Sequence, residues 1–193
     1  MKIFYYVFHM FKSIYYYIDK FNRDEIYKLN KSINIIYRNY SNKFNTKEIS
    51  ELVVFCKKQG RKVYISNNLK LALRFNFNGI YIPSFKKVLN YKNIPKKNFE
   101  IIGSAHNIIE VINKENQGCT KIFLSPIFKT KKNRNYLGVT KFNIIRLNAK
   151  KDIISLGGIN SENIKYLKMC RVEGFAGISW IKKNGPSINT GPF

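Results

Sequence analysis

Three short polar phrases, each directly after an apolar run, carry the residue types that could do chemistry. They are GSAH at Gly103–His106, LSPIFKT at Leu124–Thr130 and LGGIN at Leu156–Asn160. A fourth apolar run, FAGIS at Phe175–Ser179, closes the series. Repeats of strand, polar turn and helix are typical of parallel α/β folds, in which ligands bind at the carboxyl ends of the strands. We therefore expect function in these phrases.

The last two phrases predict a phosphate site. Gly157 and Gly158 lack side chains, so backbone N–H groups could approach an anion there. Ile178–Ser179 precede a short helix, whose N-terminus would add positive potential. In (β/α)8 barrels a phosphate is commonly bound after strands seven and eight. The alternative is that the glycines only permit a tight turn.

A basic loop follows the sixth apolar run and is expected to reach the same rim. Its candidate ligands are Thr130 and the cations Lys129, Lys131, Lys132 and Arg134. Lysine ammonium groups and a threonine hydroxyl suit a phosphate ester or pyrophosphate. The alternative is a solvated basic loop with no ligand.

Ser104 and His106 follow the fifth apolar run. Ser104 could cap the next helix, which is a structural role. His106 could be an acid–base group or a residue on the helix surface. Because the sequence identifies no partner that would orient the His106 ring, a catalytic role is not favoured.

Length and composition limit the possible functions of the chain. Its 193 residues suit one domain with a sizeable core, and 45% of them are hydrophobic. The net charge of +24 could indicate nucleic acid or an anionic membrane as partner. Like charges do not form a block of five or six, however, so no specific nucleic acid is expected. Attraction of a phosphorylated small molecule accounts for the charge more simply.

The cysteines and the N-terminal segment indicate a cytoplasmic protein. The three cysteines are scattered without a CxxC pair, which argues against a disulfide framework and against zinc. The first 18 residues are apolar and aromatic, but Lys2, His9 and Lys12 interrupt them. This segment therefore predicts neither a signal peptide nor a membrane span, and it leads into a first strand.

The apolar periodicity predicts a compact (β/α)8 barrel over residues 1–183, with a flexible tail at 184–193. The alternative is an open doubly wound sheet. The strands are expected at Tyr15–Ile18, Ile33–Arg38, Lys62–Ser66, Gly79–Ile82, Phe99–Ser104, Thr120–Ser125, Asp152–Gly157 and Gly174–Ser179. Helices are expected at Arg23–Asn30, Thr46–Gly60 with Thr46 as its cap, Leu69–Arg74, Phe85–Leu89, His106–Asn116 with Ile108, Ile109, Val111 and Ile112 inward, Thr140–Leu147, and from Asn160 or Ser161 to about Cys170.

In this order and spacing, GSAH, SPIFKT, LGGI and GIS resemble the thiamine phosphate synthase and TenI family. The resemblance covers Tyr15 to Lys182 and is strongest from Gly103 onward. It implies a (β/α)8 barrel that joins hydroxymethylpyrimidine diphosphate to thiazole phosphate and releases pyrophosphate, with magnesium as cofactor. Pro126 stands where the synthases have proline and the TenI tautomerases usually have histidine, which favours the synthase branch.

The resemblance also assigns roles to individual residues. It implies catalytic roles for Arg38, in the family's strand-two motif, and for Ser104, the family serine after strand five. It implies that the substrate and its phosphate bind through six residues: Thr130, Lys131, Lys132, Gly158, Ile178 and Ser179.

The chain departs from the family at the residues expected to hold magnesium and diphosphate. Of the strand-two motif Gln-x-Arg-x-Lys, only Arg38 is present in Ile36–Tyr40. Ser66-Asn67 replaces the family's Asn-Asp pair, and the second metal aspartate falls near Lys86. Magnesium is thus expected for the family, but no metal ligand is predicted here, because Mg²⁺ favours carboxylate oxygens.

Three hypotheses follow. The first is a protein of thiamine biosynthesis that performs the coupling or, if catalytically degenerate, binds thiazole phosphate, thiamine phosphate or pyrimidine diphosphate. The second is a non-catalytic basic scaffold or a barrel that contacts nucleic acid. The third is a divergent enzyme that acts on another phosphorylated substrate.

Overall fold

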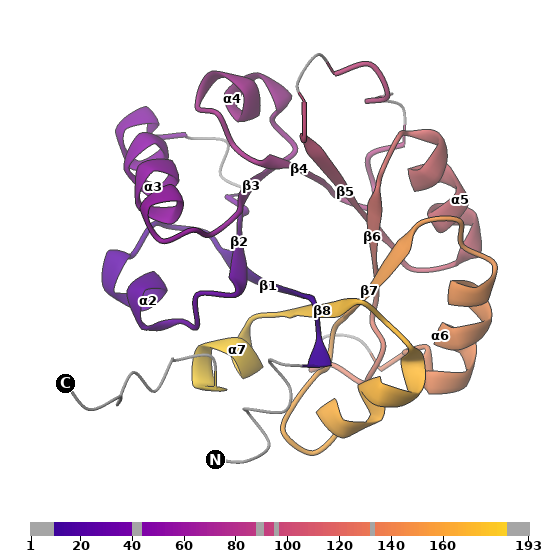
Figure 1. The fold of residues 1–193 in the computed structure, drawn as a ribbon. Helices are drawn as coiled ribbons and strands as arrows, with labels where there is room; N and C mark the ends of the chain where they lie inside the picture. Colours follow the sequence, from indigo (N-terminus) through magenta and orange to yellow (C-terminus); the bar gives the residue numbers. More distant parts are fainter. Residues whose placement is uncertain (1–9, 40–43, 88–90, 95–96, 132–133, 185–193) are drawn as a thin grey trace.

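Eight parallel strands form a closed barrel in sequence order, and β1 pairs with β8 to complete it. The computed structural model describes residues 10–39, 44–87, 91–94, 97–131 and 134–184. Figure 1 looks along the barrel, with the strands at the centre and the helices outside. The strands are β1 (Ser13–Ile18), β2 (Ile33–Tyr37), β3 (Val63–Ser66), β4 (Gly79–Ile82), β5 (Glu100–Ala105), β6 (Lys121–Leu124), β7 (Asp152–Leu156) and β8 (Gly174–Gly177). The predicted (β/α)8 barrel is confirmed, and the open doubly wound sheet is wrong.

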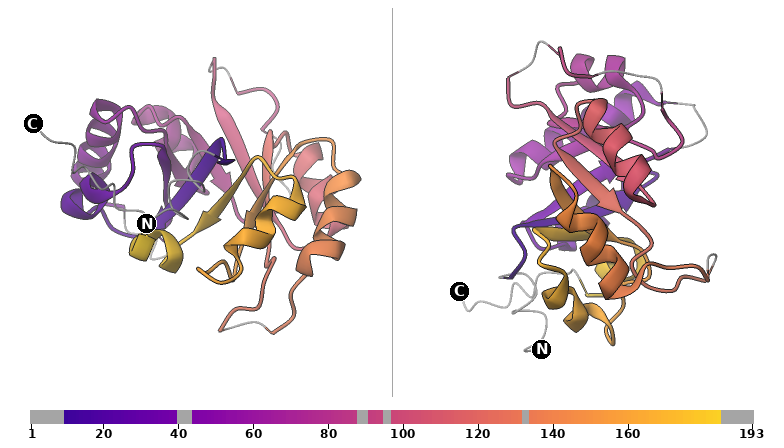
Figure 2. Two further views of the ribbon diagram at one scale, coloured as in Figure 1. Left: turned by 60° about the horizontal axis from the view of Figure 1, so that its bottom comes forward. Right: turned by 90° about the vertical axis from the view of Figure 1, so that its right-hand side faces the viewer.

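Short helices connect most of the strands and cover the barrel from outside (Figure 2). They are α2 (Arg23–Lys28), α3 (Thr46–Lys58), α4 (Leu69–Arg74), α5 (Ile108–Asn116), α6 (Gly138–Leu147), the 3-10 helix η1 (Ile164–Cys170) and α7 (Ser179–Asn184). None of the helices in the described ranges is long and apolar enough to cross a membrane.

Several local predictions about the helices are wrong. Asn45, and not Thr46, caps α3, because its side chain accepts from the N–H groups of Lys47 and Glu48. Asn107, and not Ser104, caps α5. No helix follows β4 in the residues that the structure describes. The described part of the predicted helix, 85–87, forms a turn and irregular chain, and its last two residues lie outside the description.

A buried lysine holds the irregular chain between β4 and β5 in place of a helix. Lys114 of α5 is only 2% exposed, and its ammonium donates to the carbonyl oxygens of Pro83 (2.8 Å) and Lys86 (2.6 Å). Its third acceptor is the side-chain oxygen of Gln117, at 3.0 Å. Burial lowers the pKa of Lys114. Because all three donor positions are used, the buried charge is compensated.

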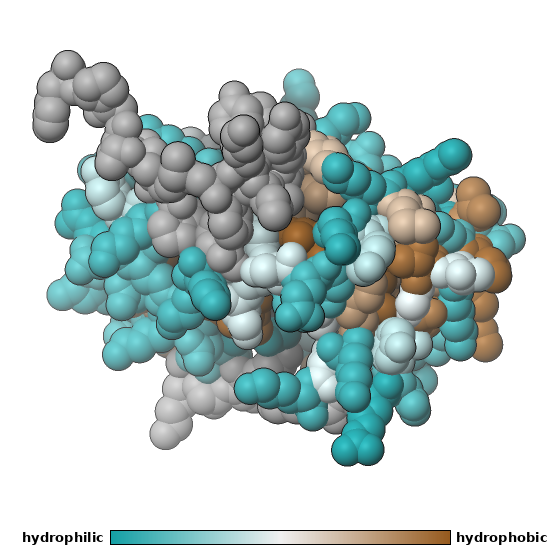
Figure 3. Space-filling view, turned by 90° about the horizontal axis from the view of Figure 1, so that it is seen from below, coloured by the Kyte–Doolittle hydropathy of each residue, from teal (hydrophilic) through white to brown (hydrophobic). Residues whose placement is uncertain are grey.

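The outer faces of α5, α6 and η1 carry exposed apolar side chains. Ile109 and Ile112 of α5 were expected to face the core, but they are 68% and 47% exposed. Ile144, Leu147 and Met169 are also exposed on the next two elements. Figure 3 shows apolar side chains gathered at its right, the side on which Figure 1 places α6 and η1. The apolar residues of these short elements therefore outnumber their core-facing positions.

Aromatic side chains fill the inside of the barrel. Alternate residues of a strand face the same side, and the inward set forms its own cluster, in which Tyr15, Tyr17, Tyr64, Tyr81 and Phe123 are the largest members. The rings of Tyr15 and Phe123 lie 4.9 Å apart between centroids. A second and larger cluster packs the outside of the strands against the helices. The inside of the barrel is therefore a packed core.

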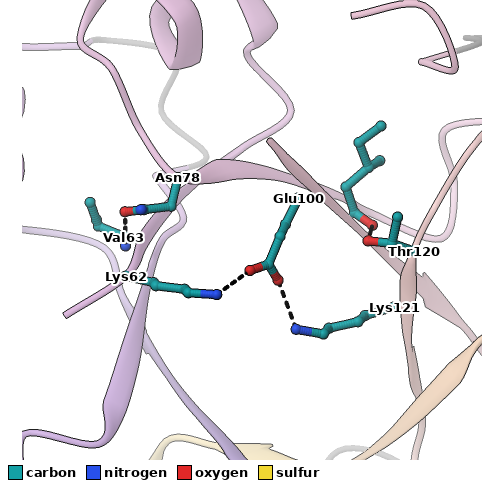
Figure 4. Close-up of polar contacts among 7 residues, drawn as sticks. Lys62, Val63, Asn78, Glu100, Thr120 and Lys121 are labelled. Atoms are coloured by element: carbon teal, nitrogen blue, oxygen red, sulfur yellow. Dashed lines mark hydrogen bonds and ion pairs between the residues drawn. The ribbon is translucent and has the colours of Figure 1, made fainter. Parts of the chain in front are cut away.

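An ion cluster lies at the N-terminal end of this interior (Figure 4). The carboxylate of Glu100 accepts from Lys62 at 2.5 Å and from Lys121 at 2.7 Å. Burial alone would raise the pKa of Glu100, but the hydrogen bonds and charges of the two lysines outweigh it and lower that pKa. The cluster links β5 to its neighbour β6 and to the residue that precedes β3.

Candidate functional site

The candidate site lies at the C-terminal mouth, which we define as the C-terminal ends of the eight strands with the loops that follow them. The inward positions of β2, β5 and β8 include Ile36, Ile102 and Ala176. Because side chains alternate, Arg38 and Ser104, each two residues further along, face the same interior. The register thus brings the two predicted catalytic residues to one mouth, although they are 66 positions apart in the sequence.

Arg38 is held at this mouth by its backbone and by an aromatic ring. Its N–H donates to the carbonyl oxygen of Ile18 at 2.7 Å. The guanidinium carbon lies 4.4 Å from the centroid of the Tyr17 ring, which is a cation–π arrangement. The guanidinium is therefore placed over Tyr17, near the C-terminal end of β1.

A cavity of about 200 Å³ lies beside Arg38 and is also lined by Ile178 and Lys182. It contains one hydrogen-bonded acid: Glu25 accepts from the Tyr16 hydroxyl at 2.5 Å and pairs with Lys182 at 3.5 Å. The pKa of Tyr16 is raised, mainly by burial and to a smaller extent by the hydrogen bond to Glu25. Tyr16 therefore stays a neutral donor. The cavity brings together Arg38, which directly follows β2, and Lys182 of α7.

Ser104 lies inside the mouth at 4% exposure and is the last but one residue of strand β5. Its register partner on β6 is Phe123. Within the described ranges its hydroxyl makes no hydrogen bond, and it is therefore able to contact a ligand that enters the mouth.

His106 joins three loops at the same mouth. Its ring Nδ1 lies 2.7 Å from the carbonyl oxygen of Ser125, and Nε2 lies 3.2 Å from the hydroxyl oxygen of Ser84. A carbonyl oxygen only accepts, so Nδ1 carries the proton and a neutral ring accepts from Ser84 at Nε2. His106 is exposed, as expected of a surface residue, but it also ties the β4 and β6 loops together. Sequence reasoning missed Ser84 and Ser125; the only signal was a serine beside each strand end.

The predicted phosphate end is built from two loops in direct contact. The N–H groups of Ile127 and Phe128 donate to the carbonyl oxygens of Leu156 (2.9 Å) and Gly157 (3.1 Å). Gly157 and Gly158 both have positive φ angles, of 93° and 73°. The loop after β6 is thus seated on the turn after β7.

Gly158 has no room for a side chain. A Cβ atom there would lie 2.3 Å from the carbonyl oxygen of Phe128 and 2.6 Å from that of Lys129. Its carbonyl oxygen accepts from the side chain of Asn163 at 2.8 Å. In the described part of the chain its N–H has no acceptor, so it is able to donate to an anion.

The remaining predicted ligands fall around this turn. Thr130 and Lys131 directly follow Lys129, which contacts Gly158, while Lys132 lies outside the described residues. Leu156 of β7 pairs with Ala176 of β8, so Gly158 and Ile178 leave neighbouring strands. Ile178 is 45% exposed, and Ser179 is the exposed first residue of α7.

The donor set at the ends of β3 and β4 does not fit magnesium. Asn67 is exposed with a φ of 54°, and the side-chain oxygen of Asn68 already accepts from the Leu71 N–H. Lys86 would repel a cation. Throughout the described ranges, no three His, Cys, Asp or Glu side chains gather as a metal site. Since Mg²⁺ takes oxygen ligands, usually with carboxylates among them, these residues do not provide a resident metal site.

Comparison with known proteins identifies relatives over most of the chain. A family model described as thiamine monophosphate synthase matches residues 29–181. A thiamine-phosphate synthase of Prochlorococcus marinus strain SARG is 31% identical over 144 residues, which cover 69% of this chain and 40% of that protein. The corresponding protein of strain AS9601 is 30% identical over 131 residues, which cover 63% and 35%. The chain thus spans less than half the length of these two relatives.

A solved structure supports the fold independently. Thiamine phosphate pyrophosphorylase from Pyrococcus furiosus superposes with a TM-score of 0.70, covering 90% of this chain and 92% of that one. At 17% sequence identity the likeness bears on the fold alone. The family match, by contrast, extends from the end of α2 into α7. The chain therefore belongs to the thiamine monophosphate synthase family.

Proposed function

We propose that this chain binds thiazole phosphate or thiamine phosphate at the C-terminal mouth, with the phosphate group beside Gly158. The observation that carries the proposal is the contact between the two loops at this end. Phe128 donates to Gly157, and the space where a Cβ of Gly158 would lie is filled by the β6 loop. This arrangement leaves the Gly158 N–H directed by the backbone and without an acceptor among the described residues. Such an N–H group is a common donor to phosphate.

The other proposed ligands supply charge and hydroxyl donors around that N–H. Ser179 follows the neighbouring strand β8, and Thr130 and Lys131 follow the segment that contacts Gly158. Lys132 belongs to the same proposal and lies outside the described residues. Lysine binds phosphate as a mobile point charge, so it adds affinity, while the backbone N–H adds direction.

Arg38 and Ser104 are proposed to contact the second substrate, hydroxymethylpyrimidine diphosphate. Both face the inside of the same mouth, and Arg38 is fixed over Tyr17. Loss of pyrophosphate leaves charge that must be neutralised in the transition state. Since the metal-holding carboxylates are absent, Arg38 is the group proposed to meet that charge. We propose that the chain keeps ester binding and that coupling, where it occurs, is slow.

Calorimetric titration tests the binding proposal. Thiazole phosphate is compared with the thiazole alcohol, which lacks only the phosphate. Saturable heat is expected with the phosphate ester and not with the alcohol. Equal heats, or no heat with thiazole phosphate or thiamine phosphate at millimolar concentration, would show that this end does not recognise the ester.

A coupling assay tests the reaction separately. Protein, hydroxymethylpyrimidine diphosphate, thiazole phosphate and magnesium are mixed, and thiamine phosphate is followed beside an active synthase. We expect turnover far below that of the synthase. Turnover at the level of the synthase would contradict slow coupling while leaving the binding proposal intact. Family membership does not favour the alternative of a scaffold or nucleic-acid partner.

A further inference from the structure

A cationic cleft lies at the N-terminal end of the barrel, opposite the C-terminal mouth. It has a volume of about 400 Å³ and lies between the start of β1, the turn from α6 to β7 and the turn from η1 to β8. We define the cationic cleft by its five basic side chains, which are Lys12, Arg146, Lys150, Lys151 and Arg171. Because its elements meet at the other ends of the strands, the cleft is separate from the candidate site.

The cleft has an excess of positive charge. Two carboxylates also line it, Asp152 and Glu173. Glu173 pairs with Lys12 at 3.6 Å. In the part of the chain that the structure describes, no carboxylate pairs with Arg146, Lys150, Lys151 or Arg171. Five cations against two carboxylates leave three positive charges around one cavity, and such a cavity attracts anions.

The backbone at Lys150 and Lys151 is fixed by a neighbouring helix. Glu115 of α5 accepts from the backbone N–H groups of Lys150 (2.6 Å) and Lys151 (3.2 Å). Its carboxylate therefore holds the backbone of the turn that carries Lys150 and Lys151. Arg171 ends η1 with a φ of 45°, and Val172 beside it lines the cleft. The turn that carries Lys150 and Lys151 is therefore anchored, so less ordering of its backbone is needed when a ligand binds.

The size and lining indicate the kind of ligand. A volume of this order suits a small molecule. Met10, Ile153 and Val172 add apolar surface to the cations. Arginine and lysine together are typical of phosphate recognition. We propose that the cationic cleft binds a small anion with two or more adjacent phosphates, either an inorganic polyphosphate or the phosphate chain of a nucleotide. This site is independent of the proposed function.

A matched pair of triple variants tests the proposal. The cleft variant is Lys150→Gln, Lys151→Gln and Arg171→Gln. The control variant is Lys47→Gln, Lys57→Gln and Lys58→Gln, which removes the same charge from the exposed side of α3. Inorganic tripolyphosphate and ATP are titrated separately into the full chain by calorimetry at about 150 mM salt, where attraction between distant charges is screened. Thermal unfolding shows whether each variant is folded.

We expect the wild type and the control variant to bind tripolyphosphate alike, and the cleft variant to bind it at least about tenfold more weakly. Equal weakening in both variants would mean general attraction to a basic protein and would overturn the proposal. No binding to the wild type would also overturn it. If the cleft variant also binds ATP about tenfold more weakly, the cleft binds the phosphate chain of nucleotides as well. If the cleft variant binds ATP as the wild type does, a nucleotide is excluded as the ligand of the cleft.

Thiazole phosphate separates this proposal from the proposed function. The cleft variant should bind that ester as the wild type does, because the two sites lie at opposite ends of the strands. If the wild type binds tripolyphosphate but not thiazole phosphate, the cleft stands and the proposed function fails. If a folded cleft variant loses thiazole phosphate binding, the cleft is not a separate site, and the proposal is overturned.

Discussion

The backbone N–H of Phe128 donates to the carbonyl oxygen of Gly157 at 3.1 Å, so the loop after β6 rests directly on the turn after β7. This contact decides what can stand at the next position. A Cβ on Gly158 would lie 2.3 Å from the carbonyl oxygen of Phe128, and no real Cβ comes so close to another atom. The loop and the turn therefore hold their relative position only with glycine at 158.

Gly158→Ala is expected to abolish or strongly weaken thiazole phosphate binding, by at least about tenfold. The new methyl group must push the β6 loop away and misplace the proposed donor. Gly60→Ala is a matched control, since Gly60 has a similar φ of 68° but nothing within 4 Å of an added Cβ. Both variants should lose about 1 kcal/mol of stability from the left-handed backbone. Only Gly158→Ala should lose binding in calorimetry. Retained binding would place the phosphate elsewhere.

The barrel was predictable because its signals are local. Each strand is a short, mostly apolar run, and most of these runs are followed by glycine or a polar residue. Such a run is recognised from its own few residues. The errors at helix starts were shifts of one or three positions, where Asn45 and Asn107 cap in place of Thr46 and Ser104. Neighbouring polar residues compete for a cap, and the sequence alone does not rank them.

The missed features depend on contacts between distant residues. Lys114 reaches Pro83 and Lys86 across 31 and 28 positions, and these contacts replace a helix after β4. His106 reaches Ser84 and Ser125 across 22 and 19 positions. The periodicity of apolar residues indicates which side of a helix is apolar, but it does not indicate how much of that side packs against the barrel. The exposed Ile109 and Ile112 therefore looked like core residues.

Binding of Mn²⁺ tests whether the chain lacks the carboxylates that would hold a metal ion. In the free protein the electron paramagnetic resonance signal of added Mn²⁺ should keep the amplitude of the aqueous ion, because Asn67 and Lys86 supply no carboxylate. The double variant Asn67→Asp and Lys86→Asp restores both acids and should reduce that signal through binding. Asn148→Asp with Lys141→Asp, at exposed positions on α6 and just after it, changes the charge equally and should not. Reduction of the signal by the unmodified protein would contradict the donor-set argument.

Glu100→Gln is expected to destabilise the protein by about 2 kcal/mol at neutral pH, because it weakens two charge-assisted hydrogen bonds. Folding lowers the pKa of Glu100 below its usual 4.5. A carboxyl group with a lowered pKa stabilises the fold above its unfolded pKa, and this contribution is lost as the pH falls through the folded pKa. Denaturant unfolding at a series of acidic pH values should therefore show a smaller loss of stability in the variant than in the wild type. Glu51→Gln, at an exposed site, should keep the wild-type slope.

The three thiols are expected to stay unreactive in the folded protein. Burial raises the pKa of Cys56 and Cys119 to about 12 and that of Cys170 to about 11, and nearby cations reduce the rise only at the first two. Because the thiolate is the reacting form, labelling by a disulfide reagent at mildly alkaline pH should be slow until the chain unfolds. In concentrated guanidinium chloride all three should react quickly. Fast labelling of one thiol in the native protein would show that its part of the fold opens readily.

Lys114→Met tests whether the Lys114 side chain holds the irregular segment between β4 and β5, where no helix was found in the described residues. The variant keeps much of the apolar stem but leaves the carbonyl oxygens of Pro83 and Lys86 without their donor. We expect a loss of about 3 kcal/mol, typical of acceptors left buried without partners. The exposed Lys141→Met controls for the lost charge. Hydrogen exchange should also quicken at the Tyr91 amide, which lies in the middle of this segment and donates to the Gln117 carbonyl oxygen. Exchange that quickened equally across the barrel would mean that Lys114 stabilises the fold as a whole and does not specifically hold the segment between β4 and β5.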